Sequence, residues 1–227
     1  MLSRDEYLVA WSRWHGGTDP AESRLVRGWL SLAYALAVPL ARLSPLVATA
    51  LGLLVALAAI APAAAGGAWL IAAGVLIGLS GLLDSLDGAL AIAGGRASRR
   101  GFVLDSAVDR LTEVGYALAF WVAGAPGLLA AAFGALCWLP DYLRARAGQA
   151  GVHETGAVSV WERPSRVAMA ALGLGGAGVV SLIDVDVTAW GADAVELSVS
   201  AAAAVGCLLG VIGTAQLGVQ LRRALAD

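Results

Sequence analysis

Residues 84–109 read DSLDGALAIAGGRASRRGFVLDSAVD, and this stretch decides how the chain folds. Apolar sequence continues on both sides of it, and its centre holds the pair Gly94-Gly95 followed by several arginines. Paired glycines interrupt helices because they favour turn conformations. We therefore expect two antiparallel neighbouring helices, at about 68–91 and 101–124, joined by a tight connection.

The composition of the whole chain assigns these helices to a membrane. Of the 227 residues, 59% are hydrophobic and 14% are charged, whereas soluble domains average about 45–50% apolar and about 25% charged residues. The chain is also too apolar to be disordered. Its 15 basic and 17 acidic residues give a net charge of −2, so we expect no nucleic-acid partner.

A membrane span needs about 20 consecutive apolar residues, and the chain has room for six such segments. We therefore predict an all-α polytopic membrane protein with six transmembrane helices. The boundaries follow turn residues such as Pro62, Gly124 and Pro164. The predicted spans are residues 45–63, 68–91, 101–124, 126–147, 164–183 and 194–221.

An amphipathic stretch, residues 22–42, precedes the first span. Its apolar residues recur at spacings of three and four, which predicts a helix lying at the membrane surface. These residues are Leu25, Trp29, Leu32, Leu36 and Leu40. We predict that residues 1–42 form a cytosolic lead, loose or briefly helical at first, that ends in this interfacial helix, and that residues 43–227 form the transmembrane domain.

The arginines indicate how the protein is oriented. All 15 basic residues are Arg, and the three loops on one side of the predicted bundle contain none. Because cytoplasmic loops are rich in Lys and Arg, we expect both termini on the cytosolic side of a cell inner membrane. The arginines of that side are Arg4, Arg13, Arg24, Arg27, Arg42, Arg96, Arg99, Arg100, Arg144, Arg146, Arg163, Arg166, Arg222 and Arg223.

Four aspartates lie inside the predicted spans, where charge is costly and usually marks a functional site. At about 100° per residue, Asp84 and Asp87 share one face of the second span. Asp105 and Asp109 share one face of the third. An ion-pair cluster that pins the helices together is the alternative, but Arg110 alone cannot neutralise four like charges. Oxygen ligands at this charge density suit Mg²⁺ or Mn²⁺, so we predict the four as metal ligands.

Gly88, Ala91 and Gly101 complete a spaced pattern with these aspartates. The pattern reads D-x-x-D-G-x-x-A over 84–91 and G-x-x-x-D-x-x-x-D over 101–109. It resembles the signature of the CDP-alcohol phosphatidyltransferases, which are integral membrane phospholipid synthases. The family signature has an arginine directly after the alanine, at the position of Ile92 in this chain.

The resemblance implies a metal-dependent enzyme of phospholipid biosynthesis. Two divalent cations, Mg²⁺ or Mn²⁺, would bind the diphosphate of CDP-diacylglycerol, and CMP would leave when an alcohol acceptor attacks. The four aspartates are the expected metal ligands, and Asp109 is also the expected catalytic base. The two glycines and the alanine of the pattern are expected to line the donor site, because small residues leave room for a bulky ligand. The resemblance also implies a homodimer.

A second resemblance concerns the acceptor. The motifs Y-x-x-A-R-A at 142–147 and E-R-x-x-R at 162–166 are similar to the branch of the family that uses inositol phosphate. The resemblance implies that Arg146, Arg163 and Arg166 bind the phosphate of a polyol such as inositol phosphate or glycerol phosphate. Topology alone also requires arginines at cytosolic span ends, so the acceptor stays open.

Two other functions stay open from the sequence. A divalent-cation transporter would use the same acids as a transport site, although the chain shows no inverted repeat. A catalytically impaired family member would act as a binding partner, and Ile92 is the residue that favours this possibility.

Two G-x-x-x-G motifs, at 74–78 and 206–210, are typical of close helix contacts. They could form dimer faces. In a chain with 29 glycines, packing within one molecule is the favoured interpretation.

Overall fold

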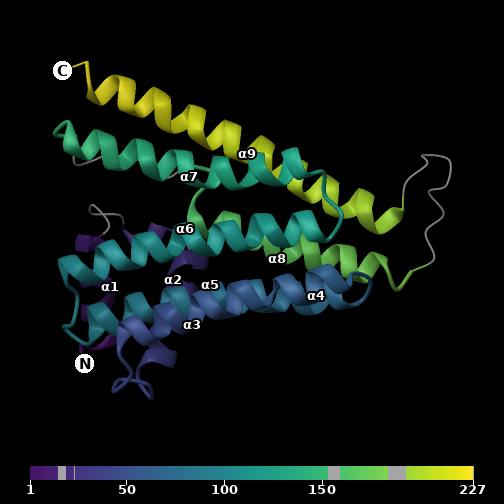
Figure 1. Ribbon diagram of the computed structural model, residues 1–227. Helices are drawn as coiled ribbons and strands as arrows, with labels where there is room; N and C mark the ends of the chain where they lie inside the picture. Colours follow the sequence, from purple (N-terminus) through teal and green to yellow (C-terminus); the bar gives the residue numbers. More distant parts are fainter. Residues whose placement is uncertain (15–18, 23, 153–158, 184–192, 227) are drawn as a thin grey trace. The chain divides into compact units, whose positions relative to one another are not determined.

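The computed structural model is built of helices, and strands are absent from the residues that it describes, which are 1–14, 19–22, 24–152, 159–183 and 193–226 (Figure 1). The predicted all-α class is thereby confirmed. The helices are α1 (Arg4–Trp14), the 3₁₀ turn η1 (Pro20–Glu22), α2 (Arg24–Ala37), α3 (Pro45–Ala58), α4 (Ile60–Ala65), α5 (Trp69–Ala93), α6 (Arg99–Val122), α7 (Gly127–Gln149), α8 (Arg163–Val180) and α9 (Ala194–Ala224).

Helices occupy all six predicted spans, with ends that differ from the predicted ones by at most three residues. By length and hydropathy, three stretches can cross a membrane: Pro45–Ala65, Trp69–Ala93 and Ala194–Ala224. Helices α6, α7 and α8 are less apolar because each carries charged residues near one end: the first part of α6, the last part of α7 and the first turn of α8. The number of six transmembrane helices therefore stays a prediction.

The first predicted span is two helices rather than one. Helix α3 ends at Ala58, and α4 begins at Ile60. The interruption follows from Pro62, which has no N–H to donate to the carbonyl four residues earlier, that of Ala58.

The chain forms two compact units. Unit 1 comprises Met1–Leu54 and Leu79–Asp109, and unit 2 comprises Val55–Gly78 and Arg110–Asp227. Helices α3, α5 and α6 each contribute residues to both units.

In unit 1, the polar N-terminal segment folds into the helix α1. Its first turn is closed by a reciprocal pair of hydrogen bonds, a capping box. The Ser3 N–H donates to Glu6 Oε2 at 2.7 Å, and the Glu6 N–H lies 3.4 Å from Ser3 Oγ. The hydrogen bonds from the Ser3 backbone and hydroxyl hold the pKa of Glu6 below its usual value. Of the two alternatives predicted for this segment, loose or briefly helical, the structure shows the short helix.

Helix α2 has two apolar faces. Leu30, Ala33 and Ala37 are buried in the core of unit 1. Trp29 and Leu32, which belong to the apolar stripe found in the sequence, are exposed. An exposed apolar stripe on a helix that is anchored by its other face is what a membrane-surface helix requires. The surface location itself stays a prediction.

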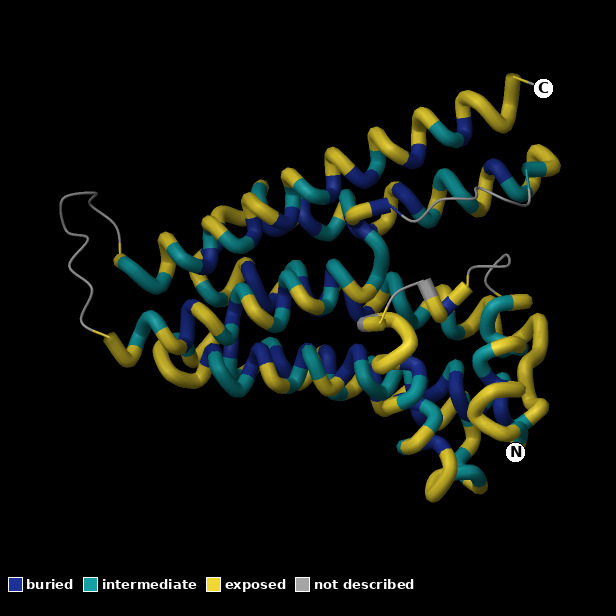
Figure 2. The backbone as a smooth tube through the Cα atoms, turned by 180° about the vertical axis from the view of Figure 1, so that it is seen from behind, coloured by how far each residue is buried: buried dark blue, intermediate teal, exposed yellow. Residues whose placement is uncertain are grey.

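In unit 2, α9 packs against α7 and α8 (Figure 1). Buried positions recur along α9 at spacings of three and four, and Figure 2 shows them as dark blue segments along the helix that leads to the C-terminus. Two of them are the glycines of the second G-x-x-x-G motif. A Cβ at Gly206 would lie 2.6 Å from the Phe133 ring, and one at Gly210 would lie 2.8 Å from Leu136 Cβ. Packing within one molecule therefore accounts for this motif.

The first G-x-x-x-G motif allows a test of this packing, because only one of its glycines is in close contact. A Cβ at Gly74 would lie 2.4 Å from the Ala171 carbonyl oxygen and 2.8 Å from the Gly175 nitrogen, both on α8. We expect Gly74→Ala to lower the free energy of unfolding in detergent by about 1–3 kcal/mol through overpacking. Thermal or denaturant unfolding measures the change.

The matched control is Gly78→Ala on the same helix. A Cβ at Gly78 meets nothing within 4 Å, and alanine is the better helix former. This variant should be as stable as the wild type or slightly more stable. Equal effects of the two substitutions would show that the α5–α8 contact is not close.

Candidate active site

A tight turn joins the two helices that carry the acidic residues. Gly95 has φ +63°, a left-handed conformation that favours glycine. The Arg96 guanidinium donates to the carbonyl of Leu43 at 2.8 Å and to that of Ala41 at 3.0 Å. It thereby ties the turn to the segment before α3. The predicted helical hairpin is confirmed.

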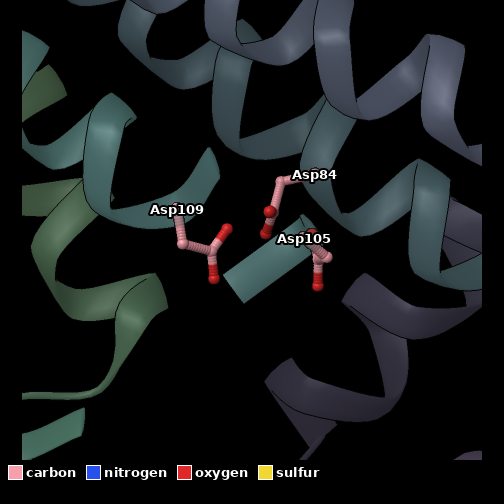
Figure 3. A group of neighbouring side chains, drawn as sticks. All are labelled: Asp84, Asp105 and Asp109. Carbon is pink, nitrogen blue, oxygen red and sulfur yellow. The ribbon is translucent and has the colours of Figure 1, made fainter. Parts of the chain in front are cut away.

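Three of the four predicted metal ligands converge. Asp84 on α5 and Asp105 and Asp109 on α6 each offer a carboxylate oxygen, and these three oxygens lie within 4.8 Å of one another. Figure 3 shows the three side chains directed toward a shared space. All three are partly buried. A cluster of carboxylate oxygens is the donor set that Mg²⁺ and Mn²⁺ prefer, so these residues fit a divalent cation.

The fourth predicted ligand, Asp87, makes a different contact. Its side chain is 5% exposed, and its Oδ2 accepts a hydrogen bond of 2.5 Å from the Thr49 hydroxyl. That hydroxyl also lies 3.0 Å from the Pro45 carbonyl oxygen. Asp87 is therefore held by α3 and lies outside the three-carboxylate group, and its role as a ligand stays a prediction.

A cleft of about 460 Å³ lies beside the acidic residues in unit 1. Asp87 and Asp105 line it, together with the three small residues of the sequence pattern, Gly88, Ala91 and Gly101. A Cβ at Gly88 would meet nothing within 4 Å, so this glycine leaves open space rather than serving close packing. The small residues thus border a space in which a ligand can lie next to the carboxylates.

Unit 2 contains a second group of charged side chains, which we call the ionic cluster: Arg110, Glu113, Asp141, Arg144, Glu162 and Arg166. At its centre, Arg166 Nη1 lies 2.8 Å from Glu113 Oε1 and 2.5 Å from Asp141 Oδ2. The side chains of Arg166 and Glu113 are each 1% exposed. Arg110 also pairs with both of these acids, at 3.1 Å from Glu113.

The edge of the ionic cluster is formed by Arg144 and Glu162. They form a bidentate salt bridge, with N–O distances of 3.0 and 2.5 Å. The Ser159 backbone N–H also donates to Glu162, at 2.8 Å. Burial alone would raise the pKa of Glu162, but Arg144 and Ser159 outweigh it and hold this pKa below its usual value. Glu162 therefore stays ionised and fixes the residues that lead into α8.

The three arginines predicted to bind an acceptor phosphate lie in different surroundings. Arg146 is exposed near the end of α7 and donates to Gln149 at 2.5 Å. Arg163 Nη2 lies 3.4 Å from the Thr112 hydroxyl. Arg166 is buried in the ionic cluster, where its Nη2 has no hydrogen-bond partner among the described residues. They do not share a common set of contacts.

Most of the ionic cluster has no signal in the sequence. The spacing of three residues between Arg110 and Glu113, and between Asp141 and Arg144, is a signal for pairs within one helix. The contacts between helices carry no such signal. The ion-pair explanation weighed for the acidic residues therefore applies to Arg110 and Glu113, whereas the aspartates of unit 1 form a separate group.

Comparison with known proteins agrees with this site. The family model of the CDP-alcohol phosphatidyltransferases matches residues 42–175. The archaetidylinositol phosphate synthase of Aeropyrum pernix is 39% identical over 101 residues, which are 43% of this chain and 52% of that protein. The enzyme of the same name from Pyrococcus horikoshii is 49% identical over 43 residues, 19% of this chain and 23% of that one. The matches thus span about half or less of these relatives.

Solved structures extend the similarity to most of the chain. Phosphatidylinositol phosphate synthase of Mycobacterium tuberculosis with manganese and citrate has a TM-score of 0.61 at 26% identity, over 82% of this chain and 88% of that one. With CDP-DAG bound, it has a TM-score of 0.60 at 24% identity, over 82% and 94%. Because the family model covers more than half of the chain and the fold agrees, the protein belongs to the CDP-alcohol phosphatidyltransferase family.

Proposed function

We propose that this protein transfers a phosphatidyl group from CDP-diacylglycerol to an alcohol acceptor and releases CMP. The observation that carries the proposal is the convergence of Asp84, Asp105 and Asp109 beside a cleft lined by small residues. The structural neighbour with CDP-DAG bound and the one with manganese agree with a CDP-linked donor and a divalent cation. Whether Mg²⁺ or Mn²⁺ serves is left to experiment.

The aspartates of unit 1 would carry out the transfer of the phosphatidyl group. Asp109 takes the proton from the acceptor hydroxyl, and that oxygen then attacks the lipid-side phosphorus of the donor. A new P–O bond forms, and the bond between this phosphorus and the bridging oxygen of the diphosphate breaks, so that CMP leaves with the electron pair. Asp84, Asp87 and Asp105, together with Asp109, would hold two divalent cations, which neutralise the diphosphate charge when bound. The positioning of donor and acceptor supplies much of the rate in such transfers.

The acceptor that we propose is an inositol phosphate. The relatives are named as archaetidylinositol phosphate synthases and the structural neighbours as a phosphatidylinositol phosphate synthase. The E-R-x-x-R motif at 162–166 supports the same choice. In addition, Arg166 Nη2 has no hydrogen-bond partner among the described residues, so its N–H group can donate to a phosphate oxygen. Arg146 and Arg163 remain proposed contacts of the same phosphate.

The remaining parts of the proposal concern the membrane. We propose six transmembrane helices within a catalytic domain of residues 43–227, an interfacial α2 within residues 1–42, cytosolic termini and a homodimer. The family is membrane-integral, and the helices found at all six predicted places support the count.

Ile92 leaves the donor phosphates without the arginine of the family signature, and we propose that Arg100 replaces it. Arg96 and Arg100 both line the cleft. The Arg96 guanidinium is already engaged with backbone carbonyl groups, including that of Leu90 at 3.4 Å. Arg100 forms no ion pair within the described part of the chain, so its charge is available to a phosphate.

An assay of CMP release tests the function. Purified protein with CDP-diacylglycerol, Mn²⁺ or Mg²⁺ and a panel of acceptors should release CMP fastest with an inositol phosphate. In the same assay, Arg100→Gln should raise the KM for the donor about tenfold, whereas Arg99→Gln should not, since Arg99 does not line the cleft. Absence of CMP release with every acceptor would refute the proposal.

A further inference from the structure

The cleft in unit 1 is also lined by residues that lie outside the spaced pattern of residues 84–109. Besides the acids and small residues, Trp14 lines it, together with Arg100 and Phe102. Trp14 is the last residue of α1. It lies 70 residues before Asp84 in the sequence, but both residues belong to unit 1. An aromatic side chain therefore borders the same cleft as the acids.

The Trp14 side chain is open to a ligand. It is 54% exposed, and it is not among the residues packed in the core of unit 1. Its indole N–H makes no hydrogen bond to any of the described residues. A large aromatic ring with an open face in a cleft that also holds arginines has the character of a stacking surface for a flat ligand.

Packing determines where Trp14 lies. Tyr7 is buried in the unit 1 core and stacks on Tyr34, with ring centroids 5.5 Å apart. The Leu2 N–H donates to the Ala93 carbonyl at the end of α5, at 2.8 Å. Tyr7 and Trp14 are seven residues apart, which places them on the same face of α1 two turns from each other. The packing of Tyr7 in the core of unit 1 therefore fixes the face of α1 on which Trp14 lies, beside the cleft.

We infer that Trp14 is the stacking platform for the pyrimidine base of the CDP-linked donor. The inference rests on the proposed function, which puts a cytidine diphosphate group in this cleft. With the diphosphate at the aspartates, the base is the flat, aromatic end of that group. Two aromatic residues, Trp14 and Phe102, line the same cleft, and the indole of Trp14 offers the larger face for stacking. Stacking on an aromatic side chain does not discriminate strongly between bases, because every base has a π-face. Trp14 therefore contributes affinity, and the selection of cytosine depends on other contacts.

The test compares a ligand that has a base with one that has none. Isothermal titration of the full-length protein in detergent with Mn²⁺ measures the affinity for CDP and for pyrophosphate. Trp14→Ala should weaken CDP binding by about five- to a hundredfold and leave pyrophosphate binding unchanged. Trp14→Phe, which retains an aromatic ring, should recover most of the CDP affinity.

Trp69→Ala is the matched control, because Trp69 is also exposed, at 64%, but lies in unit 2. It should not alter CDP binding. Unchanged CDP affinity in Trp14→Ala, or an equal loss for CDP and pyrophosphate, would overturn the inference while the wild-type enzyme still releases CMP. If the wild type neither binds CDP nor releases CMP, the proposed function itself fails, and the inference with it.

Discussion

Replacement of Asp109 by Asn should reduce CMP release by about 10³-fold or more while the protein stays folded. Asn keeps the size of the side chain but can neither accept the proton of the acceptor hydroxyl nor neutralise a cation. General-base catalysis alone contributes about 10²- to 10⁴-fold. The loss should appear in kcat, measured at saturating donor and acceptor.

Two controls separate the roles of this carboxylate. Asp5→Asn removes a side chain that is 87% exposed, at the protein surface, and should leave turnover unchanged. Raising the Mn²⁺ concentration tests for a role as ligand only. If excess Mn²⁺ restores the activity of Asp109→Asn, Asp109 is not the base. If Asp109→Asn is fully active without added metal, Asp109 has no part in the mechanism.

Removal of the Arg166 side chain should have the largest effect on stability. Arg166→Ala leaves Glu113 and Asp141 with one guanidinium partner fewer inside unit 2, and Glu113 is fully buried there. Breaking a buried charge pair by deleting one partner typically costs about 3–5 kcal/mol. Denaturant unfolding in detergent should show a loss of that size.

The reference variant is Arg222→Ala, which removes an exposed arginine at the end of α9 and should change the free energy of unfolding by less than about 0.5 kcal/mol. A double variant, Glu113→Gln with Arg166→Met, should be less destabilised than the two single changes added together, because the pair is coupled. An Arg166→Ala protein as stable as Arg222→Ala would show that the ionic cluster does not support the fold.

The two charged groups of this protein illustrate why a sequence reveals some sites and not others. The aspartates at 84, 105 and 109 were found from helical spacing, since residues one turn apart share a face and a short turn sets two helices antiparallel. Asp87 obeys the same spacing, yet it bonds to Thr49, because a side chain from a third helix competes for it. Spacing predicts the face of a helix, but it does not predict every partner on that face.

Three arginines show more clearly that the sequence does not predict which side chains become buried. Arg146, Arg163 and Arg166 carry the same charge and lie near cytosolic helix ends, so the sequence treats them alike. In the structure, Arg146 is exposed while Arg166 is 1% exposed among acids of two other helices. Long side chains reach across helix boundaries, and packing decides which of them become buried.

The sequence by itself determined the helical class, the places of the six helical stretches and the acidic face of the hairpin. It could do so because helix formation in an apolar chain depends on local hydropathy and on turn residues, which can be read along one segment. Only the tertiary structure decided that α1 docks on unit 1 and brings Trp14 to the cleft, that Gly74 and Gly206 pack within one molecule, and that Arg166 is held by Glu113. These outcomes depend on contacts between segments far apart in the chain. A local pattern such as G-x-x-x-G indicates a close-packed helix face but does not specify which segment packs against it.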